Sequence, residues 1–147
     1  MEVFRFRITA ASDADLAFLN AASNIIRLTV LSGKAGATGT VTLYDAATNT
    51  VLASSTGASL ASGATVSFNF GSANTTIPAG TTKEYYVTAD LKQFATSGTT
   101  HYSFQPQLNN AAADMSFNDS STGTANISNA NYVGIGLPIN GAVFVSQ

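Results

Sequence analysis

The sequence predicts a single all-β domain whose antiparallel strands form a sandwich. Apolar and polar residues alternate in several short runs, and Gly, Asn or Asp bounds each run. Short alternating strands separated by turn sequences have one buried and one solvated face, which is typical of antiparallel sheets. The 147 residues suffice for one core but not for a second full domain, so we treat 1–147 as one domain.

The predicted strands begin almost at the first residue. In the first strand Phe4, Phe6 and Ile8 face the core, while Arg5 and Arg7 face solvent. The same alternation recurs in five later runs, which are 26–30, 41–44, 65–70, 85–91 and 102–108. Because Pro106 has no backbone N–H, the last run is predicted to be an edge strand or to contain a bulge.

Three further segments are less regular. Residues 13–24 fit either a short strand or a turn of helix, because their apolar residues show both spacings. Asp90 in an N-cap position predicts one helical turn over 90–95 that connects two strands across the sandwich. Residues 109–131 are rich in Ala, Asn, Asp, Ser and Thr, which predicts a long loop with one or two short edge strands.

The carboxyl-terminal segment 136–147 is predicted either to close its own sheet or to lead to a following domain. Val143, Phe144 and Val145 alternate after Asn140-Gly141, a dipeptide that favours a tight turn with positive φ. We expect these three residues to pair as a strand, because an isolated apolar strand exposes unpaired backbone groups. Their partner is either their own sheet or a neighbouring copy that accepts the strand.

Composition argues against several functional classes. Charged residues make up 10% of the chain, against about 25% in an average soluble protein, and the net charge of −2 does not favour nucleic acid. No apolar run is long enough for membrane insertion. The chain has no cysteine, and it has no Gly-x-Ser-x-Gly motif that could supply a nucleophile to its single histidine, His101. We therefore expect no enzymatic activity and no cofactor apart from a calcium ion.

Two sets of residues are candidate binding sites. Asp13 and Asp15 have the spacing of a pair of calcium ligands, although an acidic turn that caps the next element is the simpler interpretation. Tyr86 and Tyr132 are candidates for stacking on a glycan, but carbohydrate-binding modules rely on Trp, which this chain lacks. Structural tyrosines at a sheet edge are the alternative to the glycan site.

Segments spread over most of residues 3–110 carry a resemblance to a known family. They are VFRFRITA (3–10), GTVTLYD (39–45), VLASS (51–55) and IPAGTTKEYYVTAD (77–90). Together they resemble the immunoglobulin-like β-sandwich domains of long surface-layer and adhesin-type proteins of bacteria and archaea. The resemblance implies about seven to nine strands, no catalytic residues and a role as a spacer, lattice contact or presentation module.

These observations together predict a non-enzymatic structural or adhesive module of an extracellular or cell-surface protein. Abundant Thr and Asn with few Lys fit exposure outside the cell. The expected partners are neighbouring domains or copies of the same protein. Two alternatives stay open, namely a carbohydrate-binding module that contacts surface glycans and a self-assembling filament or lattice subunit that uses strand donation.

Overall fold

The computed structural model describes residues 1–18, 25–70, 75–109, 114–119, 127–128 and 137–146. Strands dominate this part of the chain, and every strand pair is antiparallel. The all-β, antiparallel prediction is confirmed. None of the helical segments in the described residues has the length and hydrophobicity needed to cross a bilayer.

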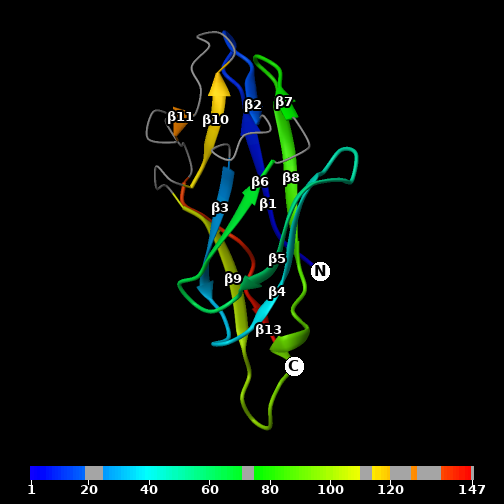
Figure 1. Cartoon of the computed structure of the whole chain (residues 1–147), viewed down its shortest axis with the longest axis vertical. Helices are drawn as coiled ribbons and strands as arrows, with labels where there is room; N and C mark the ends of the chain where they lie inside the picture. The colour runs from blue at the N-terminus through cyan, green and yellow to red at the C-terminus, as the bar shows by residue number, and fades with distance from the viewer. Residues whose placement is uncertain (19–24, 71–74, 110–113, 120–126, 129–136, 147) are drawn as a thin grey trace.

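Two larger sheets and one small sheet make up the molecule (Figure 1). Sheet 1 has the strand order β1 (Glu2–Thr9), β8 (Thr82–Ala89), β4 (Thr38–Asp45) and β5 (Thr50–Ser59). Sheet 2 has the order β12 (Ile139–Asn140), β9 (Ser103–Leu108), β3 (Ile25–Ser32) and β6 (Thr65–Asn69), and β13 (Phe144–Val145) also pairs with β9. The small sheet, at one end of the elongated molecule, has the order β11 (Ile127–Ser128), β10 (Ser116–Asp119), β2 (Leu16–Phe18) and β7 (Thr75–Ile77).

The core is sandwich-like, because sheets 1 and 2 bury their facing side chains against each other. Inward-pointing residues of both sheets are almost completely buried, including Phe6 and Leu43 of sheet 1 and Phe68 of sheet 2. Alternate residues such as Arg5 and Arg7 are exposed, as the period of two requires. The six predicted runs coincide with β1, β3, β4, β6, β8 and β9.

The described residues contain thirteen strand segments, more than the seven to nine expected. The excess comes from short ladders of two to four residues in the small sheet and on the side of β9 away from β3. Residues 16–18 of the ambiguous segment form a strand, and 19–24 lie outside the described residues. Within 109–131, β10 and β11 are the short strands expected there, but β10 is not at an edge because β2 and β11 flank it.

The helical turn predicted over 90–95 is present as the 3₁₀ helix η1 (Lys92–Phe94), which connects β8 in sheet 1 with β9 in sheet 2. The predicted N-cap is wrong by one residue, because Leu91 is the N-cap and Asp90 precedes it. Asp90 Oδ1 accepts a hydrogen bond from the backbone N–H of Lys92 at 3.1 Å. That hydrogen bond holds the pKa of Asp90 below its ordinary value. Phe94 is buried, so the turn also closes one end of the core.

Two local predictions about the last strands need correction. The strand that contains Pro106 is not an edge strand, since β3 lies on one side of β9 and β12 and β13 lie on the other. The bulge predicted as the alternative is found opposite Pro106, between Val30 and Ser32 of β3. The Asn140-Gly141 turn is also wrong, because Gly141 does not have positive φ and its N–H donates to the Pro106 carbonyl.

Gly141 is required by close packing rather than by a turn. A Cβ at this position would lie 2.8 Å from the Val3 carbonyl oxygen and 2.8 Å from Cγ of Pro106. The carboxyl-terminal segment therefore continues along β9 and passes close to Val3 of β1.

Candidate functional site

Three side chains from adjacent strands form a row on the outer face of sheet 1. Arg5 in β1 is paired with Tyr86 in β8, which is paired with Tyr44 in β4. The two tyrosine rings are parallel to within 2°, with their centroids 4.7 Å apart. The guanidinium carbon of Arg5 lies 5.2 Å from the centroid of the Tyr86 ring, within cation–π distance.

The row leaves no ring face of Tyr86 open. Because β1 and β4 flank β8 on opposite sides, Arg5 and Tyr44 cover opposite faces of the Tyr86 ring. The Tyr86 hydroxyl donates to Asn49 Oδ1 at 3.1 Å, so its polar end is also occupied. Stacking on a sugar needs a free aromatic face. In this arrangement Tyr86 acts as a cross-strand contact, and Tyr132, its partner in the sequence prediction, lies outside the described residues.

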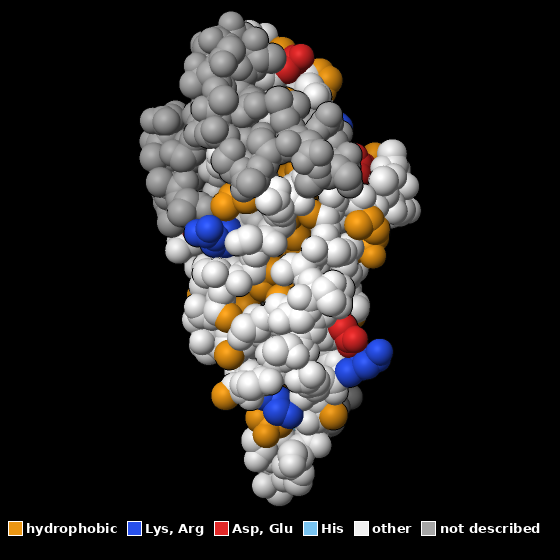
Figure 2. Space-filling view, in the orientation of Figure 1, with side chains coloured by type: hydrophobic (Ala, Val, Ile, Leu, Met, Phe, Trp, Pro, Cys, Tyr) orange, Lys and Arg blue, Asp and Glu red, His pale blue; other side chains and the backbone are white. Residues whose placement is uncertain are grey.

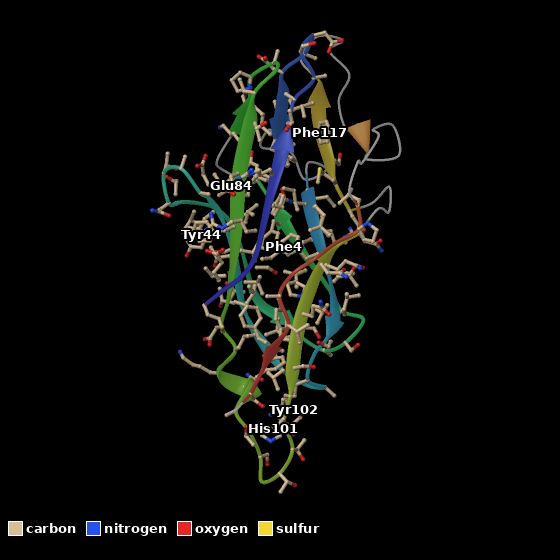
Figure 3. The ribbon with its side chains drawn as sticks, turned by 180° about the vertical axis from the view of Figure 1, so that it is seen from behind. Phe4, Tyr44, Glu84, His101, Tyr102 and Phe117 are labelled. Atoms are coloured by element: carbon tan, nitrogen blue, oxygen red, sulfur yellow. The ribbon has the colours of Figure 1, made fainter. Side chains whose placement is uncertain are left out.

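An ionic network continues from the same row. Arg5 Nε and Nη2 donate to the two carboxylate oxygens of Glu2 at 2.8 and 2.7 Å, and Arg5 Nη1 reaches Glu84 at 3.4 Å. Arg7 Nε donates to the other Glu84 oxygen at 3.2 Å. The hydrogen bonds from Arg5 hold the pKa of Glu2 below its ordinary value. Figure 3 shows Tyr44 and Glu84 on the same side of the ribbon.

The candidate calcium ligands Asp13 and Asp15 lie in the connection between β1 and β2. Asp15 Oδ1 accepts a hydrogen bond from the backbone N–H of Ala79 at 2.7 Å, which ties this connection to the turn between β7 and β8. Asp13 is exposed in the turn that precedes it. Among the residues with a described position, no group of three His, Cys, Asp or Glu side chains surrounds the pair. The contact made by Asp15 is that of a carboxylate capping a turn.

Two of the three residues expected to pair as a strand, Phe144 and Val145, pair within their own chain, whereas Val143 lies just before β13. Phe144 is opposite Phe104 and Val145 is opposite Ser103. The Ser146 N–H donates to the Tyr102 carbonyl, and the Tyr102 N–H donates to Ser146 Oγ, both at 2.8 Å. These contacts place β13 at the free edge of sheet 2. His101, next to Tyr102, is exposed, and its Nδ1 lies 2.9 Å from the Ser146 carbonyl oxygen.

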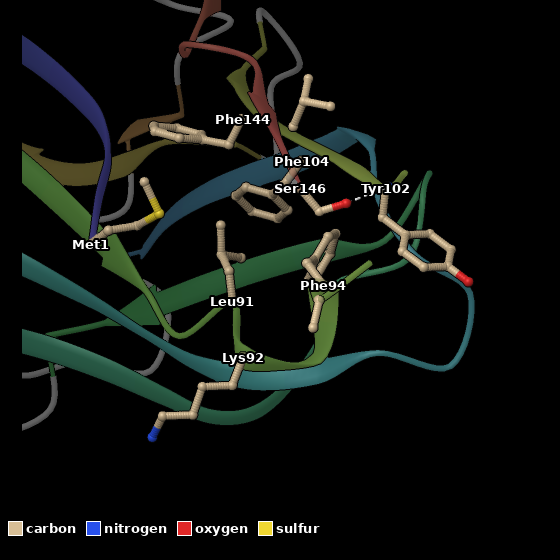
Figure 4. A pocket seen from close by; sticks show the side chains of 10 residues that line it. Met1, Leu91, Lys92, Phe94, Tyr102, Phe104, Phe144 and Ser146 are labelled. Carbon is tan, nitrogen blue, oxygen red and sulfur yellow. Dashed lines mark hydrogen bonds between the residues drawn. The ribbon is translucent and has the colours of Figure 1, made fainter. Parts of the chain in front are cut away.

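A cavity of about 380 Å³ opens beside β13 (Figure 4). Its apolar lining comes from Leu91 and Phe94 around η1, Phe104 of β9, Phe144 of β13, and Met1. Phe94 and Phe104 meet edge to face with their centroids 5.7 Å apart. The sequence did not reveal this cavity, because its lining residues come from the first residue, η1, β9 and β13, which meet only in the folded chain. The apolar pair Leu91 and Phe94 was the one local signal.

The described surface is dominated by uncharged polar groups, and six of the charged side chains contact one another, namely Glu2, Arg5, Arg7, Glu84, Asp90 and Lys92. Figure 2 shows one face on which charged side chains are sparse. The outer face of sheet 1 also carries hydroxyl pairs, such as Thr9 with Thr82 at 2.8 Å and Thr42 with Ser54 at 2.9 Å. Comparisons of the chain with protein-family models, with curated proteins and with solved structures give no match.

Proposed function

We propose that the chain is a non-enzymatic, immunoglobulin-like module of a secreted or cell-surface protein, and that it serves as a lattice-contact or presentation domain. The observation that carries the proposal is the outer face of sheet 1. There a cation–π contact, a ring stack and hydrogen bonds connect the side chains of Arg5, Tyr86, Tyr44 and Glu84. Such a cross-linked surface favours a mechanical role over the binding of a small ligand.

Strand adjacency supports the immunoglobulin-like part of the proposal. If β3, β4, β5, β6 and β8 are read as strands B, C, C′, E and F, the pairs B–E, C–F and C–C′ of the variable-type domain are all present. The departure lies in the outer strands. β1 lies beside β8, where that domain has strand G, and β9 lies beside β3, where it has strand A. The proposed relationship is therefore to the central strands of the fold.

Immunogold labelling of intact, unpermeabilised source cells tests the proposed location. We expect label on the cell surface, together with loss of the label after brief protease treatment of whole cells. A cytoplasmic protein of the same cells is the control and should be labelled only after permeabilisation. Label confined to permeabilised cells would overturn the proposal.

The carbohydrate-binding alternative predicts a different result on a glycan array. Because both faces of the Tyr86 ring are covered, we expect no glycan signal that depends on this residue. Tyr86→Ala and Tyr44→Ala make a matched pair, since each removes one ring of the stack. Glycan binding that disappears in Tyr86→Ala but persists in Tyr44→Ala would favour the alternative over the structural module.

A further inference from the structure

One edge of β13 has hydrogen-bonding groups that its own sheet does not use. The Ser146 N–H donates to the Tyr102 carbonyl, which makes Val145 and Ser103 a non-hydrogen-bonded pair of the antiparallel ladder. The N–H and C=O of Val145 therefore point away from β9. Among the described residues, no strand pairs with this outer edge of β13.

The chemistry of this edge permits pairing with another strand. Residues 141–147 contain no charged residue and no proline, which are the features that usually protect an edge from association. The side chains of Val143 and Val145 are 56% and 60% exposed. The edge strand of sheet 1 differs, because Arg5 and Arg7 of β1 would face the same arginines of a second copy in an antiparallel pair.

We propose that β13 is a homotypic docking edge, at which two copies of this chain pair antiparallel about a two-fold axis. The pairing is centred on Phe144, which lies opposite Phe144 of the second copy, and Val143 of each copy lies opposite Val145 of the other. In this register the outward-pointing N–H and C=O groups of the valines meet as hydrogen-bonded pairs. Sheet 2 then continues across the two copies. The inference rests on the proposed function and supplies the partner of its lattice contact.

The cavity beside β13 supplies the apolar contact that a short ladder needs. Residues directly opposite each other in a ladder point to the same side of the sheet, so the Phe144 ring of the second copy points to the side where the cavity lies. The cavity of about 380 Å³ is lined by Leu91, Phe94, Phe104 and Phe144, and it is large enough for an aromatic ring. The two-fold axis makes this contact twice, once on each copy.

Sedimentation velocity over a wide range of protein concentration tests the contact. We expect a reversible monomer–dimer equilibrium, which Val145→Lys weakens at least tenfold by placing two like charges at the interface. Val145→Pro should also weaken it, because the ring removes an N–H that points away from β9. Val51→Lys is the matched control, since Val51 is an exposed valine on the other edge strand of sheet 1 and is 49% exposed. Melting temperatures show whether each variant is folded.

A single-cysteine experiment tests the register, because the natural chain has no cysteine. In a non-hydrogen-bonded pair the Cα atoms lie about 4.5 Å apart, within the range that a disulfide spans. Phe144→Cys should therefore form a disulfide-linked dimer under copper-phenanthroline oxidation. Ala142→Cys is the control, since the two copies of this exposed residue are about 13 Å apart in the proposed register.

Three results would overturn the inference. They are a monomer at all concentrations, a dimer that Val145→Lys and Val51→Lys affect equally, and cross-linking at position 142 that is as efficient as at 144. A monomer on the cell surface would remove this contact while leaving the proposed location intact. A chain that dimerises but lies inside the cell would overturn the proposed function and leave the contact intact. The two failures are therefore distinguishable.

Discussion

Phe18 connects the small sheet to the rest of the molecule, and its replacement by Ala tests how the core is held together. The side chain is completely buried in β2. Its ring stacks on Phe70, which follows β6, at 4.5 Å, and meets Phe117 of β10 edge to face at 5.8 Å. Phe18 is thus the centre of an aromatic cluster that spans the small sheet and the end of sheet 2.

The expected loss can be estimated from these contacts. Truncating a fully buried Phe to Ala costs about 3–5 kcal/mol, which includes the cavity left behind. Each aromatic pair accounts for about 0.5–1.5 kcal/mol of interaction beyond area burial. A domain of this size loses about 2–4 °C of melting temperature per kcal/mol, so Phe18→Ala should melt about 6–20 °C lower. The variant should remain folded at low temperature if the total stability is in the usual range of about 5–15 kcal/mol.

Urea unfolding followed by circular dichroism, together with calorimetry, measures this loss. Tyr44→Ala is the matched control, because it also removes a stacked ring but from the outer face of sheet 1. We expect it to cost less than about 2 kcal/mol, since no cavity forms at a solvated face. A loss below 1 kcal/mol for Phe18→Ala, or equal losses in the two variants, would refute the reasoning that the aromatic cluster anchors the small sheet.

Three further predictions follow from other contacts. Gly33→Ala should lower the free energy of unfolding in urea by about 1–3 kcal/mol, because its Cβ would clash with the Leu60 carbonyl oxygen. An unchanged free energy of unfolding would show that this close approach does not restrict the site. Asp15→Ala should cost about 0.5–1.5 kcal/mol and Asp15→Asn much less, because Asn keeps an oxygen for the Ala79 N–H; a calcium-dependent rise in melting temperature that Asp15→Asn abolishes would instead favour the metal site. Arg5→Gln should raise the pKa of Glu2 toward 4.5 in an NMR titration, because Arg5 hydrogen bonds stabilise the carboxylate. Since the pKa of Glu2 is lower in the folded than in the unfolded chain, this contact stabilises the fold above the unfolded pKa, and the stabilisation is lost as the pH falls through the folded pKa. A Glu2 titration identical to that of the natural chain would contradict this prediction.

The sequence by itself determined which residues of a regularly alternating strand such as β1 are buried between Phe4 and Ile8. Alternation with a period of two is a local property, so Phe4, Phe6 and Ile8 could be assigned to the core and Arg5 and Arg7 to the surface without any knowledge of their neighbours. The helical turn near Asp90 was predictable for the same reason, since its hydrogen bond joins residues two apart in the chain.

Only the tertiary structure decided which strands lie side by side and what they form together. β1 pairs with β8, about eighty residues away, and this pairing brings Arg5 onto the Tyr86 ring. The cavity requires Met1, Leu91 and Phe144 to converge, and Gly141 is needed only because Val3 and Pro106 approach it. The physical reason is that many strand pairings satisfy the same alternation, and the pairing that occurs depends on how the whole core packs. A site built across strands therefore leaves little trace in any one of their sequences.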